Sequence, residues 1–403
     1  LQMPRWEVVG GADKGSRGGI LVRKGQDLSS QQASDRLANG AIVEELELLG
    51  DRLNYRLVRG SGPPEGWVSL SVKGKELVVR IADEDSDDDV ADSGAGPSES
   101  AGPVEPDEEL RDALEAESEA RAAKGDFAAY LPQYGALGWP LPKPRLRVLC
   151  FHAEGNAESG FTRPGSPLVS WAQESRAVEL CAFDFPGRAK LLAAERYTAA
   201  DELARDLLTV FYGKMRDEVP YVVWGHGVGA WVAFEFLVLC RKAGLHMPKA
   251  AFLMAFPAPH MPVRQRRWRK SSRMGGEKFM QEVISWDREH FAEAGGQFIF
   301  QAPLWEQHFQ PLLRADFELF DRYRFKHDGA PRFDFPIHAW HFSGEQIVRR
   351  EMVELWRDWA AGSFETRVLD DMGHVSCFYH LESRNRYFAK VIGLLKEYVD
   401  EVT

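Results

Sequence analysis

A glycine-rich turn between an apolar segment and an amphipathic segment is the feature that most limits how this chain can fold. Residues 221–224 read YVVW, residues 225–229 read GHGVG, and residues 230–237 read AWVAFEFL. Small residues on both sides of such a turn allow a strand and a helix to approach closely. The pattern therefore predicts a buried strand, a sharp turn centred on Gly227 and a helix in direct succession.

This turn and several motifs beyond it resemble the type II thioesterase family, the stand-alone editing enzymes of polyketide, nonribosomal-peptide and fatty-acid assembly lines. In that family the turn usually reads GHSMG. The ordered matches span roughly residues 145–400, so the resemblance does not depend on any single motif. The other matches are residues 149–156, LCFHAEGN, with the family's FPYAGG turn; residues 183–188, FDFPGR, with its QLPGRE segment; residues 252–259, FLMAFPAP, with a strand ending in a RAP-like turn; residues 311–317, PLLRADF, with its PxLRADF lid helix; and residues 371–374, DMGH, with its GGHFF segment.

The resemblance implies an α/β-hydrolase fold, with a mostly parallel sheet, flanking helices and a helical lid. We expect this domain at residues 126–403 and its lid at about residues 264–325, where aromatic and charged residues alternate. Most of the lid aromatics are expected to pack in the core. A few of them are expected to line a slot for an acyl chain.

The family's chemistry needs a serine nucleophile, a histidine base and an aspartate that orients the histidine. The resemblance places these roles at Gly227, His374 and Ile347 respectively. Only His374 carries a side chain able to do its task. We therefore expect thioester hydrolysis by the serine mechanism to be weak or absent.

Other residues near these positions offer substitutes for the missing groups. Glu345 precedes the expected acid position by two residues, and it is an alternative acid if the loop is rearranged. Ser376 and Cys377 lie just past His374 but share its loop, and a short apolar cysteine is more often a packed core residue than a nucleophile. A water molecule activated by His374 is a further alternative.

Loss of the serine need not damage the fold. Glycine adopts the strained angles of such a turn with little penalty, whereas another residue there costs on the order of 1–3 kcal/mol. By the resemblance, the backbone N–H groups of Val228 and Ala153 still form the oxyanion hole, a pair of donors for a carbonyl or carboxylate oxygen. The site is thus expected to bind such a group without cleaving it.

The chain before residue 126 differs in composition. Residues 1–82 hold short apolar runs with Gly and Pro punctuation, which predict a small antiparallel barrel. Residues 66–70, GWVSL, resemble a bacterial-type SH3 strand, so this unit is either a docking module for a protein partner or a stabilising cap. Residues 83–125 begin with DEDSDDD and are predicted to be an acidic, disordered linker with a short exposed helix near its end.

Basic residues gather at the start of the lid. We interpret Arg264, Arg266, Arg267 and Arg269 either as a solvated loop or partner of the chain's own acidic linker, or as a docking patch for an acidic acyl-carrier protein and its phosphopantetheine thioester. Arg188 has the same two interpretations. The formal net charge of −11 makes a nucleic-acid partner unfavourable.

Cysteine usage and hydropathy restrict the remaining classes. The 4 cysteines lie in apolar stretches without a CxxC pair, which favours a reducing compartment and argues against disulfides, a zinc site or another metal site. We expect no cofactor. No apolar run has the length of a membrane span, so we expect a cytoplasmic or plastid-interior location, with any upstream targeting segment outside this sequence, which begins at Leu1.

Three functions follow from these observations. The first is a thioesterase-family protein of acyl-carrier biosynthesis that is catalytically impaired and acts by binding acyl or carrier partners. The second is an active thioester hydrolase with a displaced set of catalytic groups around His374. The third is an adaptor whose hydrolase domain is purely structural.

Overall fold

The structure is a computed structural model that describes residues 5–11, 19–72, 75–81 and 96–402. The chain divides into two compact units, Leu1–Asp92 and Ser93–Thr403. Each unit has a hydrophobic core of its own. Among the described residues, none of the helices combines the length and the apolar character needed to cross a membrane.

The first unit is built on an antiparallel sheet of five strands in the order β4-β3-β2-β1-β7. Its strands alternate buried and outward residues, as in β3, where Leu53 and Tyr55 are fully buried on either side of Asn54. The small antiparallel β unit expected at residues 1–82 is present, while its likeness to SH3 domains stays a prediction. The strands are β1 Arg5–Val8, β2 Ile42–Leu49, β3 Arg52–Arg59, β4 Glu65–Ser69, β5 Ser71–Val72, β6 Lys75–Glu76 and β7 Val78–Ile81.

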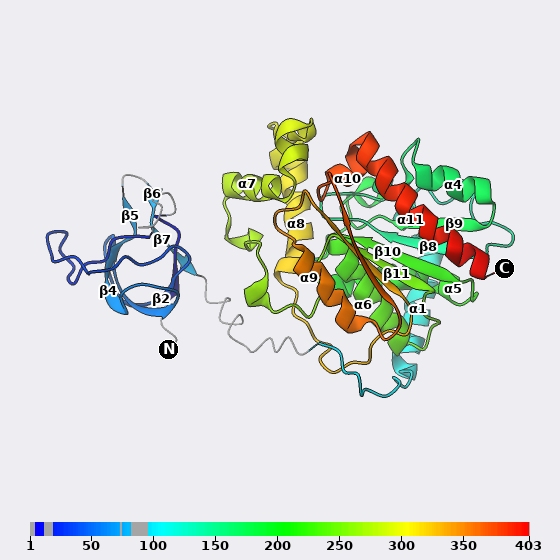
Figure 1. Ribbon diagram of the computed structural model, residues 1–403, viewed down its shortest axis with the longest axis horizontal. Helices are drawn as coiled ribbons and strands as arrows, with labels where there is room; N and C mark the ends of the chain where they lie inside the picture. Colours follow the sequence, from blue (N-terminus) through cyan, green and yellow to red (C-terminus); the bar gives the residue numbers. More distant parts are fainter. Residues whose placement is uncertain (1–4, 12–18, 73–74, 82–95, 403) are drawn as a thin grey trace. The chain divides into compact units, whose positions relative to one another are not determined.

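The second unit is built on a parallel sheet of six strands in the order β13-β12-β11-β10-β8-β9 (Figure 1). Every residue of β8 to β12 is buried, because helices cover both faces of the sheet, and these strands are accordingly mostly apolar rather than alternating. The buried Arg147 of β8 and Glu179 of β9 form an ion pair with each other at 2.8 Å. The strands are β8 Leu146–Phe151, β9 Val178–Phe183, β10 Tyr221–His226, β11 Ala250–Met254, β12 Ile337–Phe342 and β13 Phe364–Leu369.

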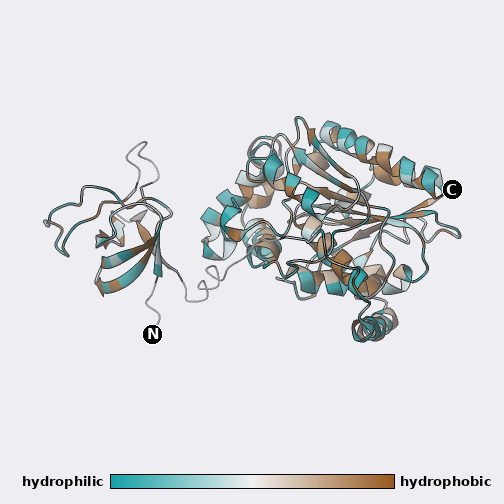
Figure 2. Cartoon of the chain, turned by 60° about the horizontal axis from the view of Figure 1, so that its bottom comes forward, coloured by the Kyte–Doolittle hydropathy of each residue, from teal (hydrophilic) through white to brown (hydrophobic). Residues whose placement is uncertain are grey.

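Helices α4 and α11 lie on one face of this sheet, and α1, α5 and α6 lie on the other (Figure 1). Figure 2 shows the hydrophobic strands enclosed between helices whose outward sides are hydrophilic. This layering confirms the α/β-hydrolase architecture. The helices are α1 Glu108–Lys124, α2 Phe127–Tyr130, α3 Ser159–Thr162, α4 Pro167–Ser175, η3 Ala189–Leu191, α5 Ala200–Met215, α6 Val228–Lys242, η4 Val263–Gln265, η5 Ser271–Arg273, α7 Gly276–Trp286, η6 Glu289–Glu293, η7 Gly296–Phe300, η8 Trp305–Phe309, α8 Gln310–Asp321, α9 Arg350–Glu354, η9 Leu355–Trp359, α10 Ser376–Tyr379 and α11 Leu381–Glu401.

Helix α1 corrects the predicted extent of the acidic linker. Asp107 caps the helix by accepting the N–H of Leu110 at 2.9 Å, and Leu114 is fully buried against the second unit. Acidic side chains on α1 meet basic ones on α5, as in the 2.5 Å pair of Glu117 and Arg205. Residues 108–124 are therefore part of the hydrolase unit, because their acidic composition is neutralised by a neighbouring helix. The acidic run at residues 83–89 lies outside the described residues.

The insertion between β11 and β12 is helical and contains residues 264–325, where the sequence predicts the lid. Its two longest helices, α7 and α8, carry buried aromatic rings that pack together, such as Phe279, Trp286 and Phe317. Figure 1 shows both helices in yellow beside one end of the sheet. Aromatic pairs of this kind bury large apolar areas, so the lid packs as part of the hydrophobic core of the second unit.

Candidate functional site

The glycine-rich turn joins β10 directly to α6. Gly227 has φ 56° and ψ −134°, angles that favour glycine over any residue with a Cβ. The flanking glycines are needed for close packing, since a Cβ on Gly229 would lie 2.3 Å from the carbonyl oxygen of Phe151 on β8. The predicted strand, sharp turn and helix are thus all present around Gly227.

The topology brings a second loop to the same place. Strand β8 pairs with β10 on one side and β9 on the other, so the strand order reverses between β8 and β10. In open α/β sheets, ligands bind beyond the carboxyl ends of the strands at such a switch point. Here the loop after β8, which carries Ala153 and Glu154, faces the turn that carries Gly227.

Glu154 occupies the space that a nucleophile side chain on Gly227 would take. A Cβ built on Gly227 would lie 2.6 Å from Glu154 Oε2 and 2.9 Å from His374 Nε2. The N–H of Val228 donates to Glu154 Oε2 at 3.0 Å, and His374 Nε2 forms an ion pair with Glu154 Oε1 at 2.6 Å. One carboxylate therefore uses both a predicted oxyanion donor and the reactive nitrogen of the histidine.

Glu345, and not Ile347, places a carboxyl group beside His374. Glu345 Oε1 lies 2.7 Å from His374 Nδ1, and both side chains are buried. The loop after β12 reaches the histidine loop because Gly344 N–H donates to the carbonyl of Met372 at 2.8 Å. Ile347 packs at the edge of the core and lines a different cavity. Glu345, the alternative acid given from the sequence, thus contacts His374, whereas the side chain at Ile347 does not.

The three side chains form a carboxylate, imidazolium, carboxylate series. Burial by itself lowers the pKa of His374, but Glu154 and Glu345 outweigh it and raise that pKa to about 10. Burial raises the pKa of Glu345 to about 7, with partial compensation from His374. For Glu154 the burial effect is exceeded by His374 and the Val228 N–H, which lower its pKa. At neutral pH, His374 is therefore protonated and is a poor general base.

A lid residue holds the loop that carries His374. Asp287, at the end of α7, accepts the N–H groups of Val375 at 2.8 Å and Ser376 at 2.7 Å. The Trp286 ring packs edge-to-face on the imidazole, with ring centroids 5.1 Å apart. His226 Nε2 contacts the carbonyl oxygen of His374 at 2.9 Å. The histidine is thus fixed from the lid and from the turn together.

The serine and cysteine past the histidine are structural. Ser376 Oγ accepts the N–H of Gly373 at 2.8 Å, which closes the turn of the loop. Cys377 is fully buried, its Sγ donates to the carbonyl of His374 at 3.4 Å, and burial raises its pKa well above the usual range. Neither side chain faces the space at Gly227, so neither supplies the nucleophile.

A cavity of about 320 Å³ borders Glu154. Most of its wall is apolar, as expected of a site for a chain-like ligand, while polar groups lie at a few points. Its apolar lining is Phe291, Ala294, Phe298, Ile299, Phe309, Leu313 and Val375, and its polar lining is Glu154, Asn156, His290, Tyr379 and His380. Within the described ranges there is no cluster of three or more potential metal ligands, and the four cysteines are free thiols.

Comparison with known proteins decides the family. The family model of the thioesterase domain matches residues 147–385, which is more than half of the chain and includes Gly227, Glu345 and His374. This chain belongs to the thioesterase family.

Curated relatives of this thioesterase-family chain carry names that refer to gramicidin S and cadicidin biosynthesis. It is 23% identical over 215 residues to the gramicidin S biosynthesis protein GrsT of Aneurinibacillus migulanus, covering 53% of this chain and 76% of that protein. It is 24% identical over 260 residues to a probable cadicidin biosynthesis thioesterase of Streptomyces griseus, covering 63% of this chain and 64% of that protein. These matches confirm the resemblance stated from the motifs.

Solved structures confirm the fold of the second unit. The RedJ thioesterase of the prodiginine pathway in Streptomyces coelicolor aligns with a TM-score of 0.52 at 25% identity, covering 63% of this chain and 94% of that one. The type II thioesterase BorB of the borrelidin cluster aligns with a TM-score of 0.51 at 24% identity, covering 64% of this chain and 94% of that one.

The structure separates the basic residues of this thioesterase-family chain into two groups. The docking prediction is wrong for Arg188, whose buried guanidinium pairs with Asp316 of the lid. It is also wrong for Arg266, which lies 4.8 Å above the Trp231 ring and donates to the carbonyl of Tyr323 at 3.0 Å. Both arginines bind the protein's own groups, so they are structural.

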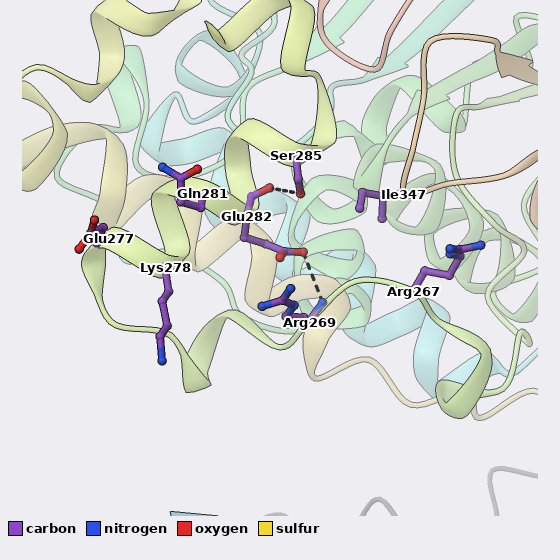
Figure 3. A pocket seen from close by; sticks show the side chains of 8 residues that line it. All are labelled: Arg267, Arg269, Glu277, Lys278, Gln281, Glu282, Ser285 and Ile347. Atoms are coloured by element: carbon purple, nitrogen blue, oxygen red, sulfur yellow. Dashed lines mark hydrogen bonds between the residues drawn. The ribbon is translucent and has the colours of Figure 1, made fainter. Parts of the chain in front are cut away.

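The remaining arginines keep the docking hypothesis open. Arg264, Arg267 and Arg269 are exposed. Arg267 and Arg269 line an open cavity of about 400 Å³ that also includes Lys278 and Ile347 (Figure 3). The floor of this cavity is ordered, because Glu282 on α7 accepts the backbone N–H of Arg269 at 3.4 Å.

Glu154 is the functional residue that sequence reasoning missed. Its signal is present in the first loop, where residues 149–156, LCFHAEGN, resemble the family's uncharged FPYAGG turn but include the charged residue Glu154. The long Glu154 side chain in this turn and the missing side chain at Gly227 are complementary, because the first fills the space that the second leaves. Recognising it requires knowing that the two turns face each other, which the parallel sheet provides.

Proposed function

We propose that this chain is a thioesterase-family protein of carrier-bound polyketide or nonribosomal-peptide biosynthesis that binds acyl or carrier partners and hydrolyses thioesters weakly or not at all. One observation carries the proposal: Gly227 has no nucleophile, and Glu154 fills the place of one. The biosynthetic assignment is supported by the relatives GrsT and the cadicidin thioesterase.

The remaining groups are insufficient for the serine reaction. In that reaction a hydroxyl attacks the thioester carbonyl while a neutral histidine accepts its proton. This chain has the orienting acid in Glu345 but neither the hydroxyl nor a neutral His374 near pH 7. Without the nucleophile, only the modest rate enhancement from binding and oxyanion donors remains.

Binding of an acyl chain or a carrier protein needs neither a nucleophilic hydroxyl nor a neutral His374. The cavity of about 320 Å³ beside Glu154 offers an apolar wall for an acyl or pantetheine chain. Arg267 and Arg269, with Lys278 beside them, offer positive charge to a phosphate or to an acidic carrier surface. Exposed charges of this kind affect the association rate more than the final affinity.

The test compares hydrolysis with binding for the same protein. Acyl-pantetheine thioesters and acyl-carrier proteins are incubated with the parent chain, with release of thiol and carrier affinity measured separately. We expect measurable affinity and little thiol release. Arg267→Ala with Arg269→Ala should weaken carrier binding, and Arg322→Ala, an exposed arginine on the opposite end of the lid sequence, is the matched control. Rapid thiol release by the parent, or absence of any affinity, contradicts the proposal.

The contact between Glu345 and His374 favours a second function, an active hydrolase with displaced catalytic groups. Hydroxide or a water deprotonated by neutral His374 is then the nucleophile. Because the His374 pKa is about 10, the rate should rise with pH toward that value and should fall in His374→Ala. A pH profile of the parent, corrected for uncatalysed thioester hydrolysis, separates this function from the first.

A further inference from the structure

Glu154 changes the site beyond the loss of the serine, because its carboxylate occupies space and a hydrogen-bond donor that a substrate would use. In a reactive thioesterase two things must fit at the turn, the nucleophile's side chain and the acyl carbonyl oxygen on the N–H of the next residue. In this chain the Glu154 carboxylate lies where a Cβ on Gly227 would go, and it also accepts the N–H of Val228. Both places are therefore taken by one side chain.

We propose that the Glu154 carboxylate is a resident ligand of the oxyanion site, so that two substitutions, Glu154 as well as Gly227, separate this chain from a reactive thioesterase. The inference rests on the proposed function, since it explains how the hydrolytic site is closed. It goes further in assigning the closure to a named side chain and in defining the chemistry of the site as carboxylate binding.

The contacts of Glu154 are those of a bound anion. Its Oε2 lies at the first N–H of the 15-residue helix α6, where the helix dipole favours negative charge. Its Oε1 lies beside the His374 imidazolium, which is itself paired with Glu345. A charge-assisted hydrogen bond and an ion pair in a buried place are stronger than the same contacts in water.

The loop that carries Glu154 is fixed on its other side. Gly155 N–H donates to Asp316 of α8 at 2.7 Å, and Asp316 also pairs with the buried Arg188. Asn156 N–H donates to the carbonyl of Ala153 at 3.1 Å, which closes the loop as a turn. Because the backbone is held on both sides of Glu154, its side chain is presented to the turn by a rigid support.

Glu154 does not act as a replacement catalyst. Its Oε1 is buried, and its charge is neutralised by His374 and by the N–H of Val228, which makes it a weak base. The carboxylate also blocks the donor that a thioester oxygen needs. The same contacts that stabilise Glu154 thus close the site.

The first experiment is a cycle of four proteins assayed for thiol release from an acyl-pantetheine thioester: the parent, Gly227→Ser, Glu154→Gly and the double variant. In the double variant the serine oxygen attacks the carbonyl carbon and its proton passes to His374. His374 then gives the proton to the departing thiol, and water splits the acyl-serine to release the acid. We expect the double variant to exceed Gly227→Ser by about 100-fold or more in kcat/KM, the usual cost of losing an oxyanion donor.

Glu154→Gln with Gly227→Ser is the matched control, because glutamine keeps the volume of the side chain and removes its charge. It should stay near Gly227→Ser alone, since the space is still filled. If Gly227→Ser alone reaches the rate of the double variant, Glu154 does not close the site and the proposal is overturned.

The second experiment detects the carboxylate site without any turnover. Propionate reproduces the part of glutamate beyond Cα, so it should bind Glu154→Gly and Glu154→Ala and raise their Tm, while propionamide should not. The parent, whose site is already filled, should show no such rise. Absence of the propionate effect in both folded variants overturns the proposal. Propionate binding with a silent double variant upholds the resident carboxylate but contradicts the claim that Glu154 and Gly227 alone separate this chain from a reactive thioesterase, while the binding function proposed above is left standing.

Discussion

The two sides of His374 depart from the family pattern in opposite ways. On the Nδ1 side the expected acid position holds Ile347, yet Glu345 supplies a carboxylate at 2.7 Å. On the Nε2 side the expected nucleophile position holds Gly227, and the group that fills its place, Glu154, contacts the nitrogen as an ion pair at 2.6 Å. The missing acid at Ile347 is thus replaced by Glu345, whereas the space of the missing nucleophile at Gly227 is filled by Glu154.

The difference follows from what each role requires. An orienting acid needs only a carboxylate oxygen within hydrogen-bond distance of the imidazole, and a loop shifted by two residues can provide it. A nucleophile must stand on the sharp turn at the helix N-terminus, because the oxyanion donor is fixed there. An acid can therefore move along the chain, whereas a nucleophile cannot.

The largest effect should come from removing the Glu345 carboxylate on the Nδ1 side of His374, in a variant whose nucleophile has been restored. In the Gly227→Ser, Glu154→Gly protein, Glu345→Gln should lower kcat by roughly 10²–10⁴-fold, because the imidazole loses its orienting carboxylate. Ile347→Asp in the same background is the control and should change kcat little, since that side chain lines another cavity. Steady-state kinetics on an acyl-pantetheine thioester decide this. A large gain from Ile347→Asp contradicts the role of Glu345.

Stability against pH should report the charge of His374. Its pKa in the folded protein is about 10, above its ordinary 6.5, so protonation stabilises the folded state fully below pH 6.5. This stabilisation should decline as the pH rises through 10. The free energy of unfolding of the parent, relative to His374→Gln, should therefore fall by on the order of a few kcal/mol between those limits.

Urea unfolding at a series of pH values measures that difference. His308→Gln, which removes an exposed histidine, is the matched control for the loss of an imidazole. A parent advantage that grows with pH contradicts the paired imidazolium.

Loss of Asp287 should loosen the loop that carries His374 and so weaken the contacts of His374 with both Glu154 and Glu345. Asp287→Ala removes the acceptor for two buried N–H groups, and each unsatisfied group costs about 1–3 kcal/mol. We expect a lower free energy of unfolding in urea and a broadened His374 signal by NMR. Asp370→Ala, at an exposed position, is the control. Unchanged stability of Asp287→Ala shows that the lid does not hold the histidine loop.

The smallest expected effect is the difference between the two carboxylates in how far each raises the pKa of His374. Glu154 raises the pKa of His374 more than Glu345 does, so Glu154→Gln should lower that pKa further than Glu345→Gln. An NMR titration of the His374 imidazole in the three proteins measures the order. The reverse order shows that the Nδ1 contact dominates the charge of the site.

The motifs on regular elements were predictable, whereas several individual side-chain contacts were not. The strand, turn and helix around Gly227 were predicted in place, because strand and helix periodicity and glycine chemistry act over a few residues. The motif left Arg188 between a structural and a docking interpretation, and its burial on Asp316, 128 residues away in the chain, favours the structural one. The helix at residues 108–124 looked like part of a linker and packs on α5, because its charges find partners there.

The sequence by itself predicted the sharp turn from local pattern and gave the absence of a serine at Gly227 from residue identity, while its ordered motifs predicted the family and, through that resemblance, the parallel sheet. Only the tertiary structure decided that Glu345 serves His374 and that Glu154 fills the space at Gly227. Those contacts join four loops that are distant in sequence and meet where parallel strands end at one edge of the sheet. Whether a carboxylate in such a loop orients the histidine or closes the site depends on which imidazole nitrogen it reaches, and packing alone sets that.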